Sequence, residues 1–157
     1  MFVLCLGAGG CATRSAPVAQ AGPAPGQTMT LEEAARVSAK AEQALGEGRF
    51  PDAGAAYVRV VTAWPDNAQA WSRLATVYLR TQQYGAAQRA CEQALRDDPR
   101  MGKARANLAL AHLFLFRAAG VQAAASTDVP EPNRMALAAL VRDVDHALAP
   151  TSPAPGQ

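Results

Sequence analysis

The sequence predicts an all-α protein made of repeated helical hairpins, and three observations carry this prediction. The chain is rich in Ala and Leu and contains many Glu and Arg residues, which favour helices. The alternation of apolar and polar residues that marks a strand is hard to find. The sequence is also similar to itself when it is shifted by one repeat length, and helix start and stop signals recur at that spacing. With 157 residues, of which 50% are hydrophobic, we expect one domain with a buried core.

The 34-residue self-similarity is carried by matched pairs of residues. The pairs are Ala41 with Ala75, Leu45 with Leu79, Phe50 with Tyr84, Ala53 with Ala87, Tyr57 with Cys91, Val61 with Leu95, and Pro65 with Pro99. Small residues allow two antiparallel helices to approach closely, and large residues fill the space between one pair of helices and the next. The prolines end the second helix of each unit. A period of this length indicates units that stack to bury a continuous core.

The second unit, residues 68–101, resembles the tetratricopeptide repeat (TPR), whose pattern is W-x2-L-G-x2-Y, then A-x3-F, then P. The matching residues here are Trp71, Leu74, Tyr78, Ala87 and Pro99. Ala75 stands where the family has Gly, and Cys91 stands where it has Phe. The first unit, residues 34–67, lacks the Trp and Leu of the pattern. The resemblance implies a right-handed solenoid of helical hairpins.

Helix signals agree with the repeat. Thr30 and Glu33 form a capping box, Pro51 stands where a first helical turn tolerates proline, and Asp66 or Asn67 can cap the helix that carries Trp71. We expect helices at 31–46, 51–63, 67–81 and 85–97.

The third unit, residues 102–149, is degenerate. Residues 102–117 repeat the first-helix pattern, and residues 119–132 contain several helix breakers that predict an insertion. Residues 133–149 then show one apolar helical stripe. Because repeat arrays end in atypical units, we expect this last helix to be a divergent cap of a domain that spans 29–149.

The N-terminus is typical of a targeting segment. Residues 1–10 are apolar and small and precede Cys11, and Ala8-Gly9-Gly10-Cys11 resembles a bacterial lipobox. This resemblance implies lipidation of Cys11 and a membrane partner through the anchor. A buried apolar strand or helical turn is the alternative. The Ala/Pro-rich segment 11–28 is expected to be a tether, and 150–157 a disordered tail.

The resemblance to TPR proteins also implies a ligand groove lined by the first helix of each unit. The implied lining is Ala35, Ser38, Glu42 and Leu45 from the first unit, Gln69, Ser72, Arg73, Thr76 and Arg80 from the second, and Lys103, Ala106, Asn107, Leu110 and Phe114 from the third. Its partner would be a protein or an extended peptide. The alternative for each of these residues is an ordinary solvated helix face.

Some TPR domains hold a C-terminal carboxylate with a Lys/Asn/Asn/Lys/Arg set. Here Ser38, Glu42 and Arg73 occupy three of those positions and only Lys103 matches, so the sequence argues against such a clamp. Arg73, Arg80 and Lys103 instead predict a mildly basic groove that favours acidic or polar extended segments.

The apolar run 108–116 has two interpretations. Burial between the second hairpin and the cap is the favoured one, and a partner or homo-oligomer surface at Phe114 and Phe116 is the other. An uninterrupted apolar run of about 18 residues is missing, so we expect no transmembrane helix.

Catalytic, metal and nucleic-acid signals are weak throughout the sequence. The net charge of +2 and the lack of basic runs interleaved with aromatics argue against nucleic-acid binding. We find no nucleophile motif, phosphate-binding glycine loop or metal-ligand spacing, so we expect no enzyme activity, cofactor or metal.

The predicted function is that of a scaffold or adaptor lipoprotein in the bacterial cell envelope, anchored at the outer membrane and facing the periplasm. Small repeat lipoproteins of this layout resemble the accessory lipoproteins of type IV pilus and tight-adherence secretion systems. The alternatives are a soluble periplasmic adaptor or chaperone and an accessory subunit of an envelope enzyme complex.

Overall fold

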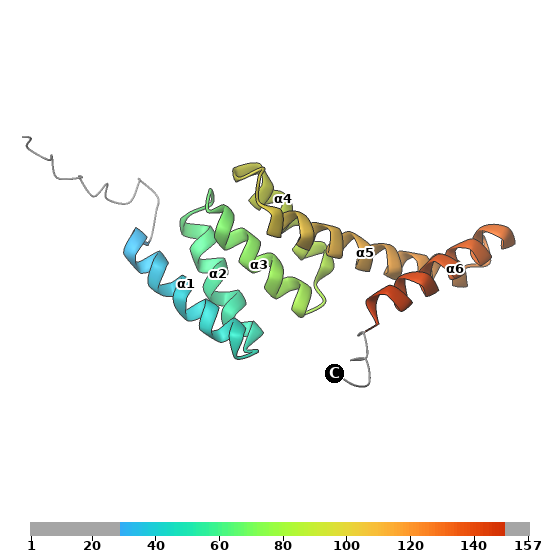
Figure 1. Cartoon of the computed structure of the whole chain (residues 1–157), viewed down its shortest axis with the longest axis horizontal. Coiled ribbons are helices and arrows are strands. Elements are labelled where there is room, and N and C mark those ends of the chain that lie inside the picture. Colours follow the sequence, from blue (N-terminus) through green and yellow to red (C-terminus); the bar gives the residue numbers. More distant parts are fainter. Residues whose placement is uncertain (1–28, 150–157) are drawn as a thin grey trace, which may run out of the picture.

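The computed structural model describes residues 29–149, and every regular element within that range is a helix. In chain order these are α1 (Leu31–Gly46), α2 (Phe50–Ala63), α3 (Ala68–Arg80), α4 (Tyr84–Asp97), α5 (Gly102–Ala125) and α6 (Glu131–Leu148). The first four helices form a stack of two hairpins, and α5 extends out of this stack (Figure 1). The α6 helix folds back along the far part of α5. The all-α helical-repeat prediction is therefore confirmed.

The helix bounds follow the period seen in the sequence. The second helices of the hairpins, α2 and α4, begin and end one repeat length apart, and α5 begins one repeat length after α3. The turns inside the two hairpins also match, because Gly48 has a φ of 75° and Gln82, its counterpart in the next unit, has a φ of 60°. Both hairpins therefore use a left-handed residue at the same point of the turn.

Caps fix the starts of two of these helices. The Thr30 hydroxyl accepts a hydrogen bond from the Glu33 backbone N–H at 3.2 Å, and the Asn67 side-chain oxygen accepts one from Ala70 at 3.0 Å. Each satisfies a backbone donor that a helix start leaves free. Asn67, rather than Asp66, is thus the cap of α3, and Pro51 lies in the first turn of α2 as expected.

Small side chains make up much of the core between the helices. Ala41 and Ala75, and likewise Ala53 and Ala87, are almost completely buried. Tyr57 and its counterpart Cys91 are buried as well, at 1% and 0% exposed. Burial at matched positions gives the two hairpins equivalent interiors.

The first helix of the third unit is longer than the sequence predicted. It was expected to end near residue 117, with an insertion from 119 to 132, but α5 continues to Ala125. Residues 118–125 include five alanines and no proline, so the helix can continue to Ser126. At 1.5 Å per residue, α5 is about 36 Å long. Its second half and α6 form an arm, residues 118–148, that projects from the stack (Figure 1).

Gly120 marks the closest approach of the two helices in this arm. A Cβ atom built on Gly120 would lie 2.7 Å from Cγ2 of Val141, closer than real Cβ contacts. Val141 is the one buried residue of α6, and Gly120 is the one buried residue in the distal half of α5. The arm is therefore held by a small contact that requires glycine.

The α5 helix is also long and apolar enough to cross a membrane, judged by length and composition alone. Its most apolar 18-residue stretch has a mean hydropathy of 1.4, and 11% of that stretch is buried. No such helix was expected, because the sequence has no uninterrupted apolar run of about 18 residues. One helix of this kind is weak evidence for insertion, and α5 packs against α3, α4 and α6.

Candidate functional site

Side-chain contacts tie the first helices of the three units, α1, α3 and α5, into one face. Arg73 Nε on α3 lies 2.7 Å from a Glu42 carboxylate oxygen on α1. On the other side of α3, the Asn107 side-chain amide of α5 donates to the Thr76 hydroxyl at 3.0 Å. These contacts bring together Glu42, Arg73, Thr76 and Asn107, four residues of the expected groove lining.

Glu42 is the centre of a small polar network at this face. The Tyr57 hydroxyl on α2 donates a 2.5 Å hydrogen bond to the same Glu42 oxygen that Arg73 approaches. The Arg73 contact is an ion pair by distance, although its N–H is not directed at the oxygen. Burial, together with the hydrogen bond to Glu42, raises the pKa of Tyr57 above its ordinary value. Tyr57 therefore stays a neutral donor, and the charges of Glu42 and Arg73 largely cancel.

This pairing changes the expected charge of the groove. Arg73 was expected to be one of three basic groove residues, but its charge is neutralised by Glu42. Arg80 and Lys103 remain exposed, and neither belongs to an ion pair among residues 29–149. The basic character of the face therefore lies toward the end of α3 and the start of α5.

The other implied groove residues divide by exposure. Gln69 is exposed and Ser38 is half-buried, so both are accessible on the face. Ser72 is 1% exposed and its hydroxyl has no hydrogen-bond partner, so it does not line an open surface. Phe114 is half-buried because its ring stacks on Tyr84, with the ring centroids 4.5 Å apart. The side chain of Phe114 therefore joins α5 to the start of α4.

The apolar run 108–116 is covered only in part. Ala111 is buried, but Leu110 is 41% exposed and Phe116 is 39% exposed. The favoured interpretation, burial on all sides, is wrong for these two residues. The reason is that α6 packs on the distal half of α5, around Gly120, and not over Phe116.

The sequence did not indicate the structural role of Trp64, and it indicated only part of the role of Glu42. Trp64 donates its indole N–H to the Met29 carbonyl at 3.2 Å, and this bond fastens the end of α2 to the chain before α1. Glu42 was named only as a groove residue, although it accepts the bond from Tyr57. The signal for Trp64 was a large aromatic residue directly before Pro65, at the end of a repeat unit.

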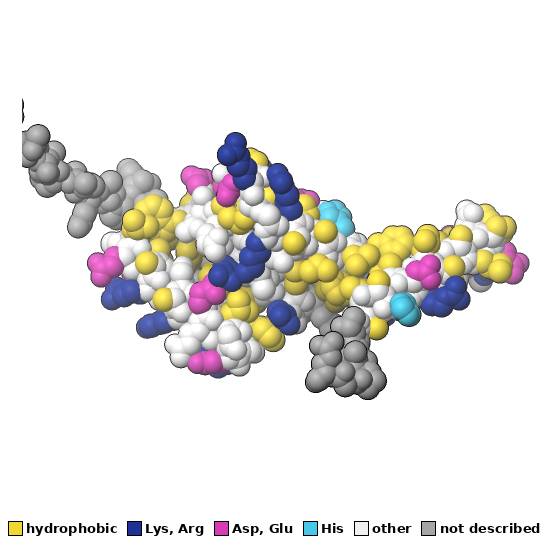
Figure 2. All heavy atoms as spheres, in the orientation of Figure 1, with side chains coloured by type: hydrophobic (Ala, Val, Ile, Leu, Met, Phe, Trp, Pro, Cys, Tyr) yellow, Lys and Arg dark blue, Asp and Glu magenta, His cyan; other side chains and the backbone are white. Residues whose placement is uncertain are grey.

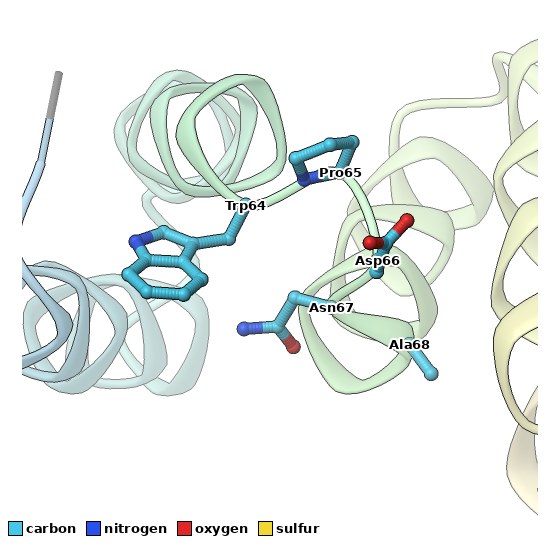
Figure 3. A pocket seen from close by; sticks show the side chains of 5 residues that line it. All are labelled: Trp64, Pro65, Asp66, Asn67 and Ala68. Atoms are coloured by element: carbon cyan, nitrogen blue, oxygen red, sulfur yellow. The ribbon is translucent and has the colours of Figure 1, made fainter. Parts of the chain in front are cut away.

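A cavity of about 490 Å³ lies at the turn between α2 and α3. Trp64, Pro65, Asp66, Asn67 and Ala68 line it, and the indole and Asn67 extend to the same side of the turn (Figure 3). Asn67 is engaged in capping α3, and the Pro65 carbonyl accepts a 2.7 Å bond from the Trp71 indole. The polar groups at this turn therefore serve the joint between the two hairpins.

Cys91 is the one free cysteine within the described range, and it lies in the core. Burial raises the pKa of its thiol to about 11. The thiol is therefore protonated at neutral pH and acts as a small apolar side chain. Residues 29–149 contain no group of three or more His, Cys, Asp or Glu side chains that could hold a metal ion.

Comparisons with known proteins agree with the helical-repeat fold. Residues 44–113 match the family model described as Tetratricopeptide repeat. Among solved structures, the chain is similar to the first TPR of Spaghetti (RPAP3) bound to the HSP90 peptide SRMEEVD. The TM-score is 0.55 and the sequence identity 21%, over 78% of this chain and 98% of that chain, which establishes the shared fold. No curated protein matches the chain.

The region from the end of α1 to the middle of α5 matches the tetratricopeptide repeat family, and the chain has the helical-repeat fold of a TPR domain. This is the fold of a protein–protein interaction scaffold.

Proposed function

We propose that this chain is an envelope lipoprotein whose repeat domain holds an extended segment of a partner protein across α1, α3 and α5. The observation that carries the proposal is the continuous face formed by those helices through the Glu42–Arg73 and Thr76–Asn107 contacts. Ser38, Gln69, Arg80 and Lys103 offer accessible hydrogen-bonding groups along this face. The face would hold the partner protein in position, and the chain would not catalyse a reaction on that partner.

The solved neighbour supports peptide binding as the mode, because the first TPR of Spaghetti is bound to a peptide. The contacts here differ from a free-carboxylate clamp, since Arg73 already faces Glu42 at 2.7 Å. The partner segment is therefore proposed to bind through its length and not through its terminal carboxylate.

The envelope part of the proposal rests on the sequence before the repeat domain. Cys11 would carry the lipid, and residues 11–28 would link it to α1; both lie outside the described residues. An acyl chain contributes about 0.8 kcal/mol for each buried methylene, so two or three chains would give stable attachment. Scaffolding of a pilus or secretion machine is the specific role we propose in that location.

Photo-crosslinking tests the binding face. A photoreactive residue at Gln69 or Lys103 of the full chain should capture a partner protein in the cells that make it. The matched control is the same residue at Arg59, which is exposed on α2. Equal capture from Arg59 would count against the face.

The proposed location in the cell envelope is tested by the identity of the captured protein and by whether Cys11 is lipidated. The wild-type chain should take up radiolabelled palmitate and fractionate with membranes, and Cys11→Ser should do neither. If the wild type takes no label, the anchor is wrong and a periplasmic adaptor is favoured. Capture of a pilus or secretion component supports the specific role, whereas capture of a cell-wall enzyme supports the accessory-subunit alternative.

A further inference from the structure

One side of α5 continues the binding face beyond the repeat stack. Lys103, Leu110, Phe114 and Val121 follow one another at helical spacing, so they lie on one side of the helix. Leu110 and Val121 are 41% and 48% exposed. Because Asn107, which contacts Thr76, lies one helical turn after Lys103, this side of α5 borders α3 at its start. The binding face therefore leads from α3 onto the arm.

An apolar cavity lies where this side of α5 reaches the arm. Its volume is about 450 Å³, and its lining is Val121, Ala124, Ala125, Ala138, Val141, Arg142 and Asp145. Val121 thus ends the exposed stripe of α5 and opens the cavity. Hydrophobic side chains gather along α5 and α6 in Figure 2.

The charges around this surface are mostly positive once internal pairs are removed. Asp145 bonds to Arg117, and Glu42 is held by Arg73. Arg80, Lys103 and Arg142 are exposed and belong to no ion pair within residues 29–149. Asp143 and Glu131, the other acidic residues of α6, do not line the cavity. A partner with carboxylates beside its apolar residues fits this arrangement.

We propose that this surface, from Lys103 to the cavity at Val121, binds an acidic amphipathic helix of a partner protein. The inference rests on the proposed function, and it adds a helical segment of the same partner protein to the extended segment proposed for the stack. Leu110 and Val121 are separated by about 16 Å along α5, which three turns of a partner helix span. An apolar side chain fills the cavity, and acidic residues on the flanks of the helix meet Lys103 and Arg142.

Selection from a random library of peptides about five helical turns long, displayed against the purified full chain, tests this without knowledge of the partner. Enriched peptides should be net acidic, with apolar residues at helical spacing. Val121→Glu and Leu110→Glu should each lower their affinity at least tenfold. The matched controls are Val58→Glu and Leu31→Glu, at residues 42% and 69% exposed outside this surface, and they should leave the affinity within twofold.

Several outcomes would overturn the inference. One such outcome is the enrichment of basic peptides. Another is the enrichment of acidic peptides whose affinity is unchanged by Val121→Glu. Both outcomes would leave the proposed binding in the groove intact. If the affinity of those acidic peptides falls only when Gln69 is substituted, the peptides bind to the stack alone. Enrichment of no peptide would contradict both proposals.

The same variants exclude two other occupants of the surface. If sedimentation shows a dimer of the wild type that Val121→Glu dissociates, the surface joins two copies of the chain. If flotation with phosphatidylcholine/phosphatidylglycerol vesicles depends on Val121 and Leu110, the surface meets a membrane. Either result would overturn the assignment to a partner helix.

Discussion

At residues 48 and 82 the chain makes the same turn with different amino acids. Gly48 adopts a φ of 75° without a Cβ penalty, whereas Gln82 adopts a φ of 60° with one. A left-handed conformation costs a non-glycine residue about 1–2 kcal/mol. The second hairpin therefore carries strain at a point where the first does not.

The pair gives a prediction with its own control. Gln82→Gly should raise the free energy of unfolding by about 0.5–1 kcal/mol, because relief of strain exceeds the added chain entropy. Gly48→Ala should lower it by about 1 kcal/mol. Urea denaturation followed by circular dichroism measures both changes. Equal effects of the same sign at the two positions would show that the turns do not share this conformation.

At the residue scale, the sequence predicted the role of a side chain where that role depends on one local property. The matched alanines and the caps at Thr30 and Asn67 act through size and local hydrogen bonds, and both are visible in the sequence. The Glu42–Arg73 pair joins residues from different repeats, so its neutralising effect needed the structure. Ser72 failed as a groove residue for the same reason, since its burial depends on neighbouring helices.

At the scale of elements, the period placed the helix starts of the stack and of α5 closely, but it did not fix the end of α5. The helix continues because residues 118–125 contain no proline, and because Phe116 stands at the position where Gly48 and Gln82 make the left-handed turn in the first two units. The position of α6 was not predictable either. It depends on contact at Gly120, a residue type that by sequence alone marks a weak point of a helix.

The Gly120–Val141 contact predicts a specific defect. Gly120→Ala should lower the free energy of unfolding by about 1–2 kcal/mol, because the new methyl group overlaps Val141. Gly102→Ala in the same helix is the control, since nothing lies within 4 Å of its added Cβ. Thermal denaturation of both variants measures the difference.

A second change separates crowding from other causes. Adding Val141→Ala to Gly120→Ala should recover part of the loss, as expected for residues in direct contact. Additive losses would mean that the two helices do not meet at this point.

On the scale of the whole molecule, stability should fall from the stack to the arm. The α3 helix buries five residues and contacts α2, α4 and α5, whereas α6 buries Val141 alone. Regions with few buried apolar contacts open at low free energy. The arm is therefore the part of the domain that a bound partner would stabilise most.

Hydrogen exchange measured by mass spectrometry tests this gradient. Amides of α6 and of α5 beyond Ala118 should exchange at least about a hundredfold faster than those of α3. The reason is that the smaller buried apolar area of the arm lowers its free energy of local opening by about 3 kcal/mol relative to α3. Uniform protection across α3 and α6 would contradict the gradient and show the arm to be part of one cooperative unit.

The positions of the two tryptophans determine what an optical experiment on this protein can detect. Trp64 and Trp71 both lie at the α2–α3 joint, with their indole N–H groups bonded to Met29 and Pro65. The sequence has no other tryptophan, so the arm has no intrinsic indole reporter. Tryptophan fluorescence will therefore report on the joint between the two hairpins and will not detect changes in the arm. A tryptophan introduced at exposed Met135 would make the arm visible in the same measurement.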